Sequence, residues 1–251
     1  MIGGTAMRRL RVKATRLAKS PQSSYPTCRV EGGPAMYCLL VAVIVATWLV
    51  WAPQAQAGTI TFHSNQTWQV WIKTNTFPFV RFIGFAQNVC PSPLSPTNCP
   101  AGATLYGFPG ISWTANLSNI PGATWIWAPR VTGATTPAGL AQFFFVKVLT
   151  LSGAPTAGII HVAVDDFAEV IVNGKPVGAI GSVTDESVAS AAQSSLTSFN
   201  ITPFLITGPN LIAIRARNGS FGGCNPNSNP TNCTYATNPA GVVFGGSIEF
   251  Q

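Results

Sequence analysis

"AEVIVNGKPVGAI", residues 168–180, contains two β-rich runs on either side of Asn173-Gly174. An Asn-Gly dipeptide readily takes positive φ at both central positions of a type I′ turn, the turn that joins two antiparallel strands most tightly. The stretch therefore predicts a β-hairpin. It also predicts an antiparallel sheet for the chain around it.

Short apolar runs separated by turn signals surround this hairpin on both sides. The strand candidates are TITFHS (59–64), TWQVWI (67–72), TWIWAP (124–129), FFFVKVLTL (143–151), IIHVAV (159–164), LIAIRARN (211–218) and VVFGGSIEF (242–250). Residues 182–198, rich in Ser and Ala, are predicted to form a loop, with a short helical turn as the alternative. Strands of this length and spacing, with no helical period after residue 57, predict an all-β fold, a single antiparallel β-sandwich.

Residues 1–57 have the pattern of a signal segment rather than of a folded domain. Basic residues precede the apolar run at 36–52, and Ala55-Gln56-Ala57 has the small-x-small pattern of a cleavage site. We expect cleavage after Ala57, which leaves residues 58–251 as one secreted domain. The alternative is an uncleaved signal anchor, because the apolar run is at the short limit for crossing a bilayer. In that case the leader would be the chain's contact with the membrane.

The charge of the chain lies mostly in that leader. It holds seven of the 14 Lys and Arg residues and one of the seven acidic residues, which leaves seven basic and six acidic groups and a net charge of +1. No basic stripe interleaved with aromatic residues remains in the domain. The sequence therefore predicts no nucleic-acid partner.

Two ten-residue stretches with a shared frame, CPSPLSPTNC (90–99) and CNPNSNPTNC (224–233), contain the four cysteines of the domain. Four cysteines allow three disulfide connectivities. The repeated spacing favours two local bridges, Cys90 to Cys99 and Cys224 to Cys233, in an oxidising compartment. Zinc is the alternative, although thiolate pairs that bind zinc usually lie two to four residues apart.

The order of motifs from Thr124 to Phe250 resembles the galactose-binding-domain-like jelly-roll modules of secreted bacterial carbohydrate-active proteins. The resemblance is carried by TWIWAP, VAVDDFAEVIVNGKPVG, FNITPFLITGPNLIAIRARN and NPAGVVF. It implies a jelly-roll sandwich. It implies a function less sharply, because this fold hosts carbohydrate binding, adhesion and structural packing.

Asp165-Asp166 with Glu169 is the acidic cluster of the hairpin region. Glycoside hydrolases use a pair of carboxyl groups that flank one bond. Adjacent residues of an extended segment point to opposite faces, so Asp165 and Asp166 are not expected to act in this way. The resemblance implies a structural role in the turn before the hairpin, with structural calcium as an alternative cofactor. Asp165, Asp166 and Glu249 are its candidate ligands.

Aromatic residues are the candidate sugar platforms, since the apolar face of a sugar ring packs against an aromatic ring. They are Trp68, Trp71, Trp113, Trp125, Trp127, Tyr106 and Tyr235. Most tryptophans are expected in the core, with Trp125 and Trp127 on an inner face. Tyr106 and Tyr235, beside the stapled loops, are the candidate ligand-binding residues, together with Asn218 and Asn238. The hypothesis is that the two loops form one rim around a binding surface.

These observations predict a secreted or cell-surface, non-catalytic carbohydrate-binding module whose partner is a glycan or cell-surface polysaccharide. The alternative is a structural or adhesive extracellular protein that contacts copies of itself or another protein. A glycoside hydrolase ranks third. No Ser-His-Asp arrangement or dinucleotide motif supports another enzyme class.

Overall fold

The computed structural model describes residues 57–75, 80–92, 104–107, 113–131, 141–221, 224, 233–234 and 237–251. The predicted leader lies outside these ranges apart from Ala57, and so do Cys99 and Tyr235. For Cys90 and Tyr106, the side chains lie outside the description. In the part of the chain that is described, no helix is long and apolar enough to cross a bilayer.

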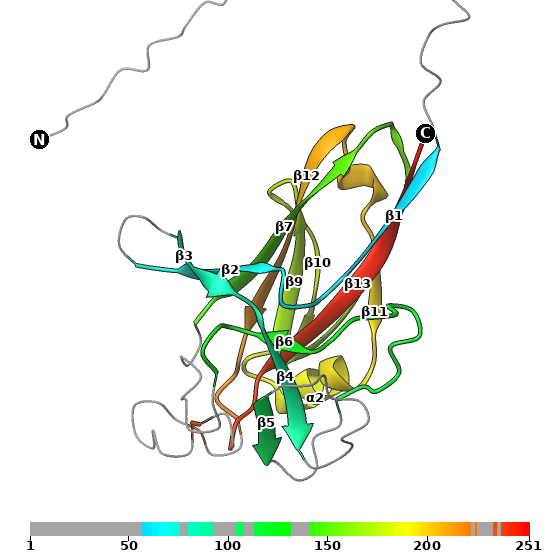
Figure 1. Ribbon diagram of the computed structural model, residues 1–251. Helices are drawn as coiled ribbons and strands as arrows, with labels where there is room; N and C mark the ends of the chain where they lie inside the picture. Colours follow the sequence, from blue (N-terminus) through cyan, green and yellow to red (C-terminus); the bar gives the residue numbers. More distant parts are fainter. Residues whose placement is uncertain are drawn as a thin grey trace, which may run out of the picture. The chain divides into compact units, whose positions relative to one another are not determined.

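Two β-sheets face each other and form a sandwich (Figure 1). The first, in the described part of the chain, has seven strands and the order β11-β8-β13-β6-β4-β5, with β1 also paired to β13. Its strands are β1 (Gly58–His63), β4 (Gln87–Ser92), β5 (Thr104–Gly107), β6 (Ile126–Trp127), β8 (Pro155–Asp165), β11 (Thr197–Asn200) and β13 (Gly241–Phe250).

The second sheet has six described strands in the order β10-β9-β12-β7-β2-β3. Its strands are β2 (Gln69–Lys73), β3 (Val80–Phe85), β7 (Phe143–Leu151), β9 (Phe167–Val172), β10 (Lys175–Gly181) and β12 (Gly208–Arg217). All pairings in this sheet are antiparallel. The predicted all-β sandwich is confirmed, with one departure: β4 and β5 of the first sheet pair in parallel.

The hairpin at 168–180 is confirmed as β9 and β10, joined at Asn173 (φ 51°) and Gly174 (φ 77°). The Asn173 side chain also forms hydrogen bonds with residues outside its own turn. Its Nδ2 donates to the Phe204 carbonyl oxygen (2.9 Å) and to Asn210 Oδ1 (2.9 Å), and its Oδ1 accepts from the backbone N–H of Leu211 (2.9 Å). The same asparagine thus forms the turn and fixes it to β12.

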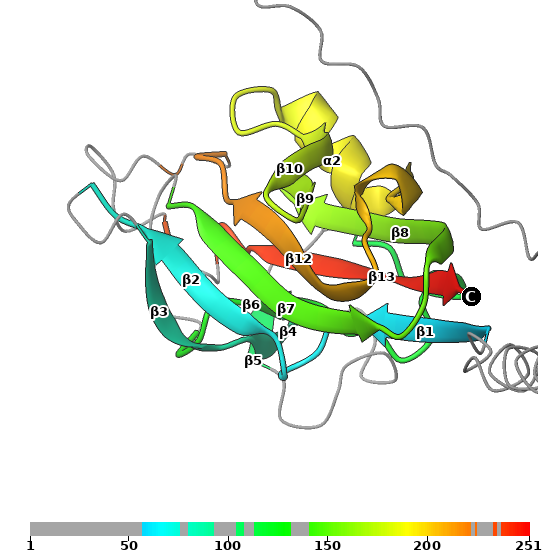
Figure 2. The same ribbon diagram turned by 90° about the horizontal axis from the view of Figure 1, so that it is seen from above.

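The core fills the space between the sheets. The alternation of residues along the strands predicts which side chains enter it. Ile160, Val162 and Val164 of β8 are fully buried, while Ile159 on the opposite face is exposed. Ala163, also on that opposite face, is buried because the helix α2 packs over β8. Figure 2 shows α2 beside β8 and β10.

In residues 182–198 it is the alternative, a helical stretch, that forms, as α2 (Glu186–Ser194), with loop on either side. Asp185 caps this helix, since its Oδ1 accepts from the backbone N–H groups of Ser187 (3.0 Å) and Val188 (3.2 Å). Nine residues with only two small buried side chains, Ala189 and Ala192, show no readable hydrophobic period. A 3₁₀ turn, η1 (Thr202–Phe204), follows β11.

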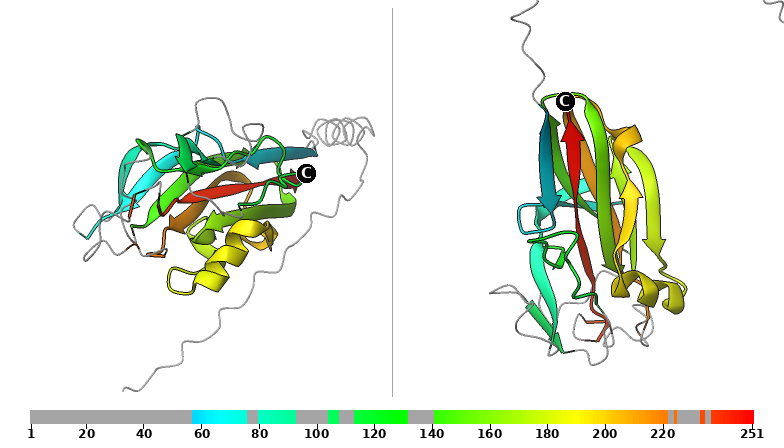
Figure 3. Two further views of the ribbon diagram at one scale, coloured as in Figure 1. Left: turned by 90° about the horizontal axis from the view of Figure 1, so that it is seen from below. Right: turned by 90° about the vertical axis from the view of Figure 1, so that its right-hand side faces the viewer.

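Strands β3 and β4 were also not predicted, although they are part of the two sheets. Both views of the long axis, Figure 1 and the right panel of Figure 3, show β4 and β5 directed to the end of the sandwich where β13 begins. The turn from β8 to β9 lies at this end too, because Asp165 pairs with Gly241, the first residue of β13.

Candidate functional site

An aromatic row crosses three strands on the outer face of the six-stranded sheet. Trp71 of β2 pairs with Phe82 of β3 on one side and with Phe144 of β7 on the other. The rings of Trp71 and Phe82 lie 5.5 Å apart between centroids, at 59°. Since Phe143 and Phe145 are buried and side chains alternate along a strand, Phe144 faces outward.

A second row lies next to the aromatic row and continues it toward β9. Gln69 pairs with Val146, Val146 with Ala213, and Ala213 with Ile171. Beyond it, Val148 pairs with Leu211.

The outer face of an antiparallel sheet is usually polar, but the part of this face from Trp71 to Leu211 is mostly apolar, with the ion pair of Arg215 and Glu169 next to Phe144. Phe82, Val148 and Leu211 are 43%, 56% and 41% exposed. Because exposed apolar patches are often interaction sites, this part of the face is the candidate site.

This face is hollowed into a groove of about 680 Å³, within the range of roughly 300–1,000 Å³ that is usual for ligand sites. Its lining is mostly apolar and consists of Thr67, Gln69, Trp71, Val80, Phe144, Val146, Lys147, Val148, Ile171, Gly174, Leu211 and Ala213. The groove therefore combines one aromatic end with a long aliphatic floor.

Among the polar side chains that line the groove, that of Gln69 lies beside Trp71. The Gln69 Oε1 accepts from the indole N–H of Trp71 (3.2 Å), and Lys147 Nζ donates to Thr67 Oγ1 (3.1 Å). The Lys147 ammonium also lies 5.7 Å from the ring centroid of the buried Trp68, a cation–π contact. Lys147 leaves β7 on the same face as the buried Phe143 and Phe145, so its ammonium lies on the core side of the sheet and not beside the Trp71 ring.

Most of the described tryptophans lie in the core, as the sequence predicts. Trp113 and Trp125 are buried and stack on each other with centroids 4.3 Å apart at 26°, and Trp68 and Trp127 are fully buried. Trp71 is only half-buried. It is the described tryptophan that retains an accessible ring.

Phe144 was missed in the sequence, although a signal for it is present. FFFVKVLTL has apolar residues on both faces, at 143, 145, 149 and 151 on one and at 144, 146 and 148 on the other, so one apolar set had to lie outside the core. The sequence could not say which set, because the choice depends on the side to which the second sheet packs.

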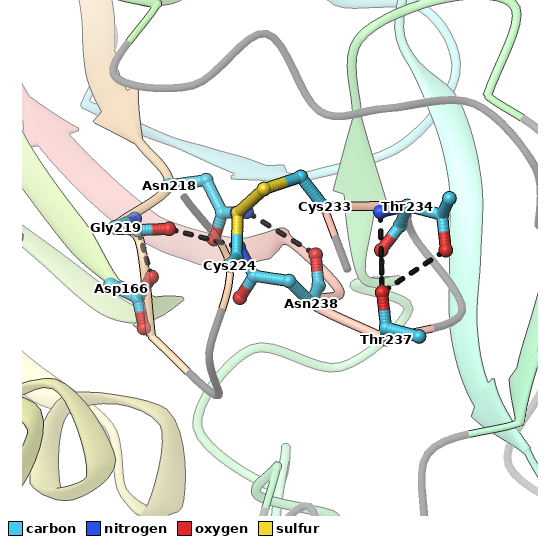
Figure 4. The surroundings of a disulfide bond; sticks show 8 residues. All are labelled: Asp166, Asn218, Gly219, Cys224, Cys233, Thr234, Thr237 and Asn238. Carbon is cyan, nitrogen blue, oxygen red and sulfur yellow. Dashed lines mark hydrogen bonds between the residues drawn. A yellow bond between two sulfur atoms is a disulfide. The ribbon is translucent and has the colours of Figure 1, made fainter. Parts of the chain in front are cut away.

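The second stapled loop contains the predicted disulfide between Cys224 and Cys233, with an S–S distance of 2.08 Å (Figure 4). The predicted bridge between Cys90 and Cys99 lies outside the described residues. So do the Tyr235 and Tyr106 side chains, and with them the hypothesis that the two loops form one rim.

Asn218 and Asn238 are brought together beside this disulfide, but both side chains are buried and bind within the fold. Asn238 Nδ2 donates to the Gly219 carbonyl oxygen at 2.9 Å (Figure 4). The hydrogen-bond network assigns the Asn218 amide nitrogen toward Asp166, where it donates to Oδ2 (2.9 Å) and the amide oxygen accepts from Asn238 Nδ2 (3.2 Å). These side chains therefore hold the loop to the β8–β9 turn, and their polar groups are used there.

Asp165 and Asp166 form a buried carboxyl pair at the end of β8. The expectation that they point to opposite faces is wrong, because the chain leaves the strand at Asp166 and the two carboxyl groups lie within hydrogen-bonding reach. Trp113 Nε1 donates to Asp165 Oδ2 (2.9 Å), and the backbone N–H of Gly219 donates to Asp166 Oδ2 (2.6 Å). Burial is the main cause that raises the pKa of both carboxyls, of Asp165 most, and the nearby Asp166 carboxylate raises the pKa of Asp165 further.

Gly181 completes the turn against this pair. It has a φ of 76°, and a Cβ at this position would overlap the Asp166 carbonyl oxygen, which also accepts from Ser182 N–H (3.1 Å). Only glycine fits here, since the space is closed and the conformation is left-handed.

The three candidate calcium ligands do not come together. Asp165 pairs with Gly241 on β13, whereas Glu249 lies eight residues further along that strand and pairs with Ala157. Eight residues of strand place Glu249 about 27 Å from the Asp165–Asp166 pair. In the described ranges no three His, Cys, Asp or Glu side chains converge as metal ligands would. The two adjacent acids, Asp165 and Asp166, instead accept hydrogen bonds from the Trp113 indole and the Gly219 backbone N–H.

No family model matches this chain, and the search of curated proteins found no match. Among solved structures, it is similar to an α-L-rhamnosidase from Streptomyces avermitilis (21% identity over 48% of this chain and 10% of that one, TM-score 0.34). It is also similar to a β-galactosidase from Bacteroides fragilis (16%, 76% and 23%, TM-score 0.35) and a β-D-glucuronidase from Dictyoglomus thermophilum (14%, 77% and 29%, TM-score 0.35). The chain thus spans less than a third of each of these proteins. Likenesses at these TM-scores carry no argument, so fold and function rest on the residues of the chain itself.

Proposed function

We propose that this chain is a secreted, non-catalytic carbohydrate-binding module and that the groove on the six-stranded sheet holds the sugar. The observation that carries the proposal is the accessible ring of Trp71 in the row Phe82-Trp71-Phe144, with polar groups beside it. A sugar ring can lay its C–H face on such a row while its hydroxyls bind Gln69 and Thr67.

The absence of catalysis is part of the proposal. Glycoside hydrolysis needs two carboxyl groups on either side of the scissile bond. None of the described residues that line the groove carries a carboxyl group. The buried pair at Asp165 and Asp166 is already bonded to Trp113 and Gly219, which supports a structural role for it.

Secretion is proposed on the leader pattern together with the disulfide between Cys224 and Cys233, since disulfides form and persist in oxidising compartments.

A second candidate function, adhesion or self-assembly, is favoured by the aliphatic part of the same face. Val80, Val148 and Leu211 are exposed there, and apolar patches of this kind also bind proteins. The aromatic row and the polar groups beside it support the sugar-binding function better.

Glycan-array binding of residues 58–251, produced under oxidising conditions, tests the proposal. We expect Trp71→Ala to weaken binding by about tenfold or more and Trp71→Phe to retain part of it. Val188→Ala, which removes an exposed apolar side chain from α2, is the matched control and should bind normally. Binding that persists unchanged in Trp71→Ala would place the sugar elsewhere, and no binding to any glycan would leave the adhesive function.

A further inference from the structure

The groove on the outer face of the six-stranded sheet has its polar side chains at one end. Gln69 and Trp71 of β2, with Thr67 just before the strand, line the groove there. The Gln69 Oε1 accepts from the Trp71 indole N–H, and its Nε2 bonds to no described residue, so the amide can donate to a ligand. The Lys147 ammonium lies over Trp68 on the core side and brings no charge to this end. No other charged residue is among the described residues of the lining.

The rest of the groove, over β7, β12 and β9, is lined by apolar side chains. Val146 pairs with Ala213, and Ala213 with Ile171, which gives a floor that crosses these three strands. Val148 and Leu211 pair with each other next to this floor, and both are exposed. They form a wall, whereas the small Ala213 side chain is buried, so the face is hollow between them.

Polar groups at this end are already used within the fold. Strands β9, β12 and β7 are internal to the sheet, each with a partner strand on both sides, so most of their N–H and C=O groups are paired. Asn173, beside Gly174 of the lining, donates to Phe204 and Asn210 and accepts from Leu211. A sugar hydroxyl over the floor would give up its bonds to water and form none in return. An alkyl group there loses nothing and gains from burial.

We infer that the sugar bound in this groove carries an aliphatic substituent, an acyl or alkyl chain that lies over the floor of Val146, Ala213 and Ile171. Its ring stacks on Trp71 and its hydroxyls bind Gln69. The floor crosses two strand spacings, roughly 10 Å, which is room for a short chain. This inference rests on the proposed function and adds to it the chemical class of the ligand, a chemistry that acylated polysaccharides and glycolipids share.

Calorimetric titration of the protein with alkyl glycosides tests it. The probes are methyl, butyl, hexyl and octyl glycosides of glucose, galactose, mannose and rhamnose, kept below the concentrations at which they form micelles. We expect the affinity to rise about two- to fourfold for each methylene that the floor buries, and then to level off. A plateau at the butyl glycoside would indicate the short acyl group of a polysaccharide, and a rise up to the octyl glycoside the chain of a glycolipid.

Variants of the wall separate the chain from the sugar. Val148→Ser combined with Leu211→Ser should reduce the gain per methylene far more than the affinity for the methyl glycoside, because the wall contacts the chain. Trp71→Ala should weaken the binding of every chain length by a similar factor, because it removes the platform for the ring. Val188→Ser, which changes an exposed apolar side chain of α2, is the matched control and should leave the series unchanged.

Equal affinities for methyl and octyl glycosides, both lost in Trp71→Ala, would overturn the inference while the sugar-binding function stands. A gain per methylene that the double serine variant keeps would also overturn it, as would a failure of every octyl glycoside to bind. Octanol that binds as tightly as the octyl glycosides would leave no role for the sugar, and would remove the proposed function together with the inference.

Discussion

The indole N–H of Trp113 donates to Asp165 Oδ2 at 2.9 Å, although the two residues are 52 positions apart. Trp113 also stacks on Trp125, which belongs to the buried segment around β6. This bond therefore ties the segment before β6 to the end of β8. It shows that the acidic dipeptide, which looks like catalytic equipment in the sequence, holds two parts of the fold together.

The stability of the protein should fall as the pH rises above about 4. Burial raises the pKa of Asp165 well above its ordinary value, so the folded state binds a proton that the unfolded state, with a carboxyl pKa of about 3.9, releases. The stabilising contribution is complete below that unfolded value and is lost as the pH passes up through the folded pKa. Urea denaturation at a series of pH values measures this change in the free energy of unfolding.

The matched variant for this measurement is Asp165→Asn, a neutral mimic of the protonated acid that can still accept from Trp113. It should be more stable than the natural chain at pH 7 and should show a smaller dependence on pH. A natural chain whose stability rises steadily from pH 4 to pH 7, with no change in slope for the variant, would contradict the raised pKa.

Removal of the second disulfide should lower the free energy of unfolding by about 2–3 kcal/mol, because the bridge closes a loop with a sequence separation of nine and restricts the unfolded chain. The double variant Cys224→Ser with Cys233→Ser, compared in urea with the natural chain, measures the loss. Its binding to glycans should be retained, since neither cysteine is among the residues that line the groove. A loss of sugar binding in a folded variant would instead indicate that the sugar-binding site lies at the stapled loop.

Gly181→Ala should destabilise the fold by more than Gly208→Ala. Both glycines have left-handed φ values, 76° and 91°, but a Cβ at Gly208 meets nothing within 4 Å, whereas one at Gly181 overlaps the Asp166 carbonyl oxygen. We expect about 1–2 kcal/mol for Gly208→Ala from the backbone alone. The loss of stability for Gly181→Ala should be larger, and thermal melting of the two variants measures both losses. Equal losses would mean that the turn can shift to make room for the Cβ.

Light scattering over a range of protein concentrations should find a monomer if the groove serves sugars rather than copies of the chain. Leu211→Ser, which removes an exposed apolar side chain from the groove, should remain monomeric and fold normally. A concentration-dependent oligomer that this variant disperses would favour the adhesive function.

Calcium at millimolar concentration should leave the melting temperature unchanged, because Glu249 lies far along β13 from the carboxyl pair. A rise in melting temperature that grows with calcium concentration would indicate a site that stabilises the folded state. Magnesium at the same concentration is the control for ionic strength.

The sequence by itself determined the elements whose signals are local. Asn173-Gly174 specifies its turn through positive φ, the alternation in β8 and β12 marks their buried faces, and the spacing of Cys224 and Cys233 predicts their bridge. The helix α2 could be given only as an alternative to a loop, without its bounds, because two small buried alanines give no readable period. Strands β3 and β4 lacked a clear alternation.

Only the tertiary structure decided which face of β7 is covered and what Asp165 and Asp166 do. Packing of the second sheet buries Phe145 and leaves Phe144 beside Trp71, and chain reversal after β8 turns the acids toward Trp113 and Gly219. Both outcomes depend on contacts between residues far apart in the chain. Periodicity specifies that a strand has two faces, but burial of one of them is a property of what packs against it.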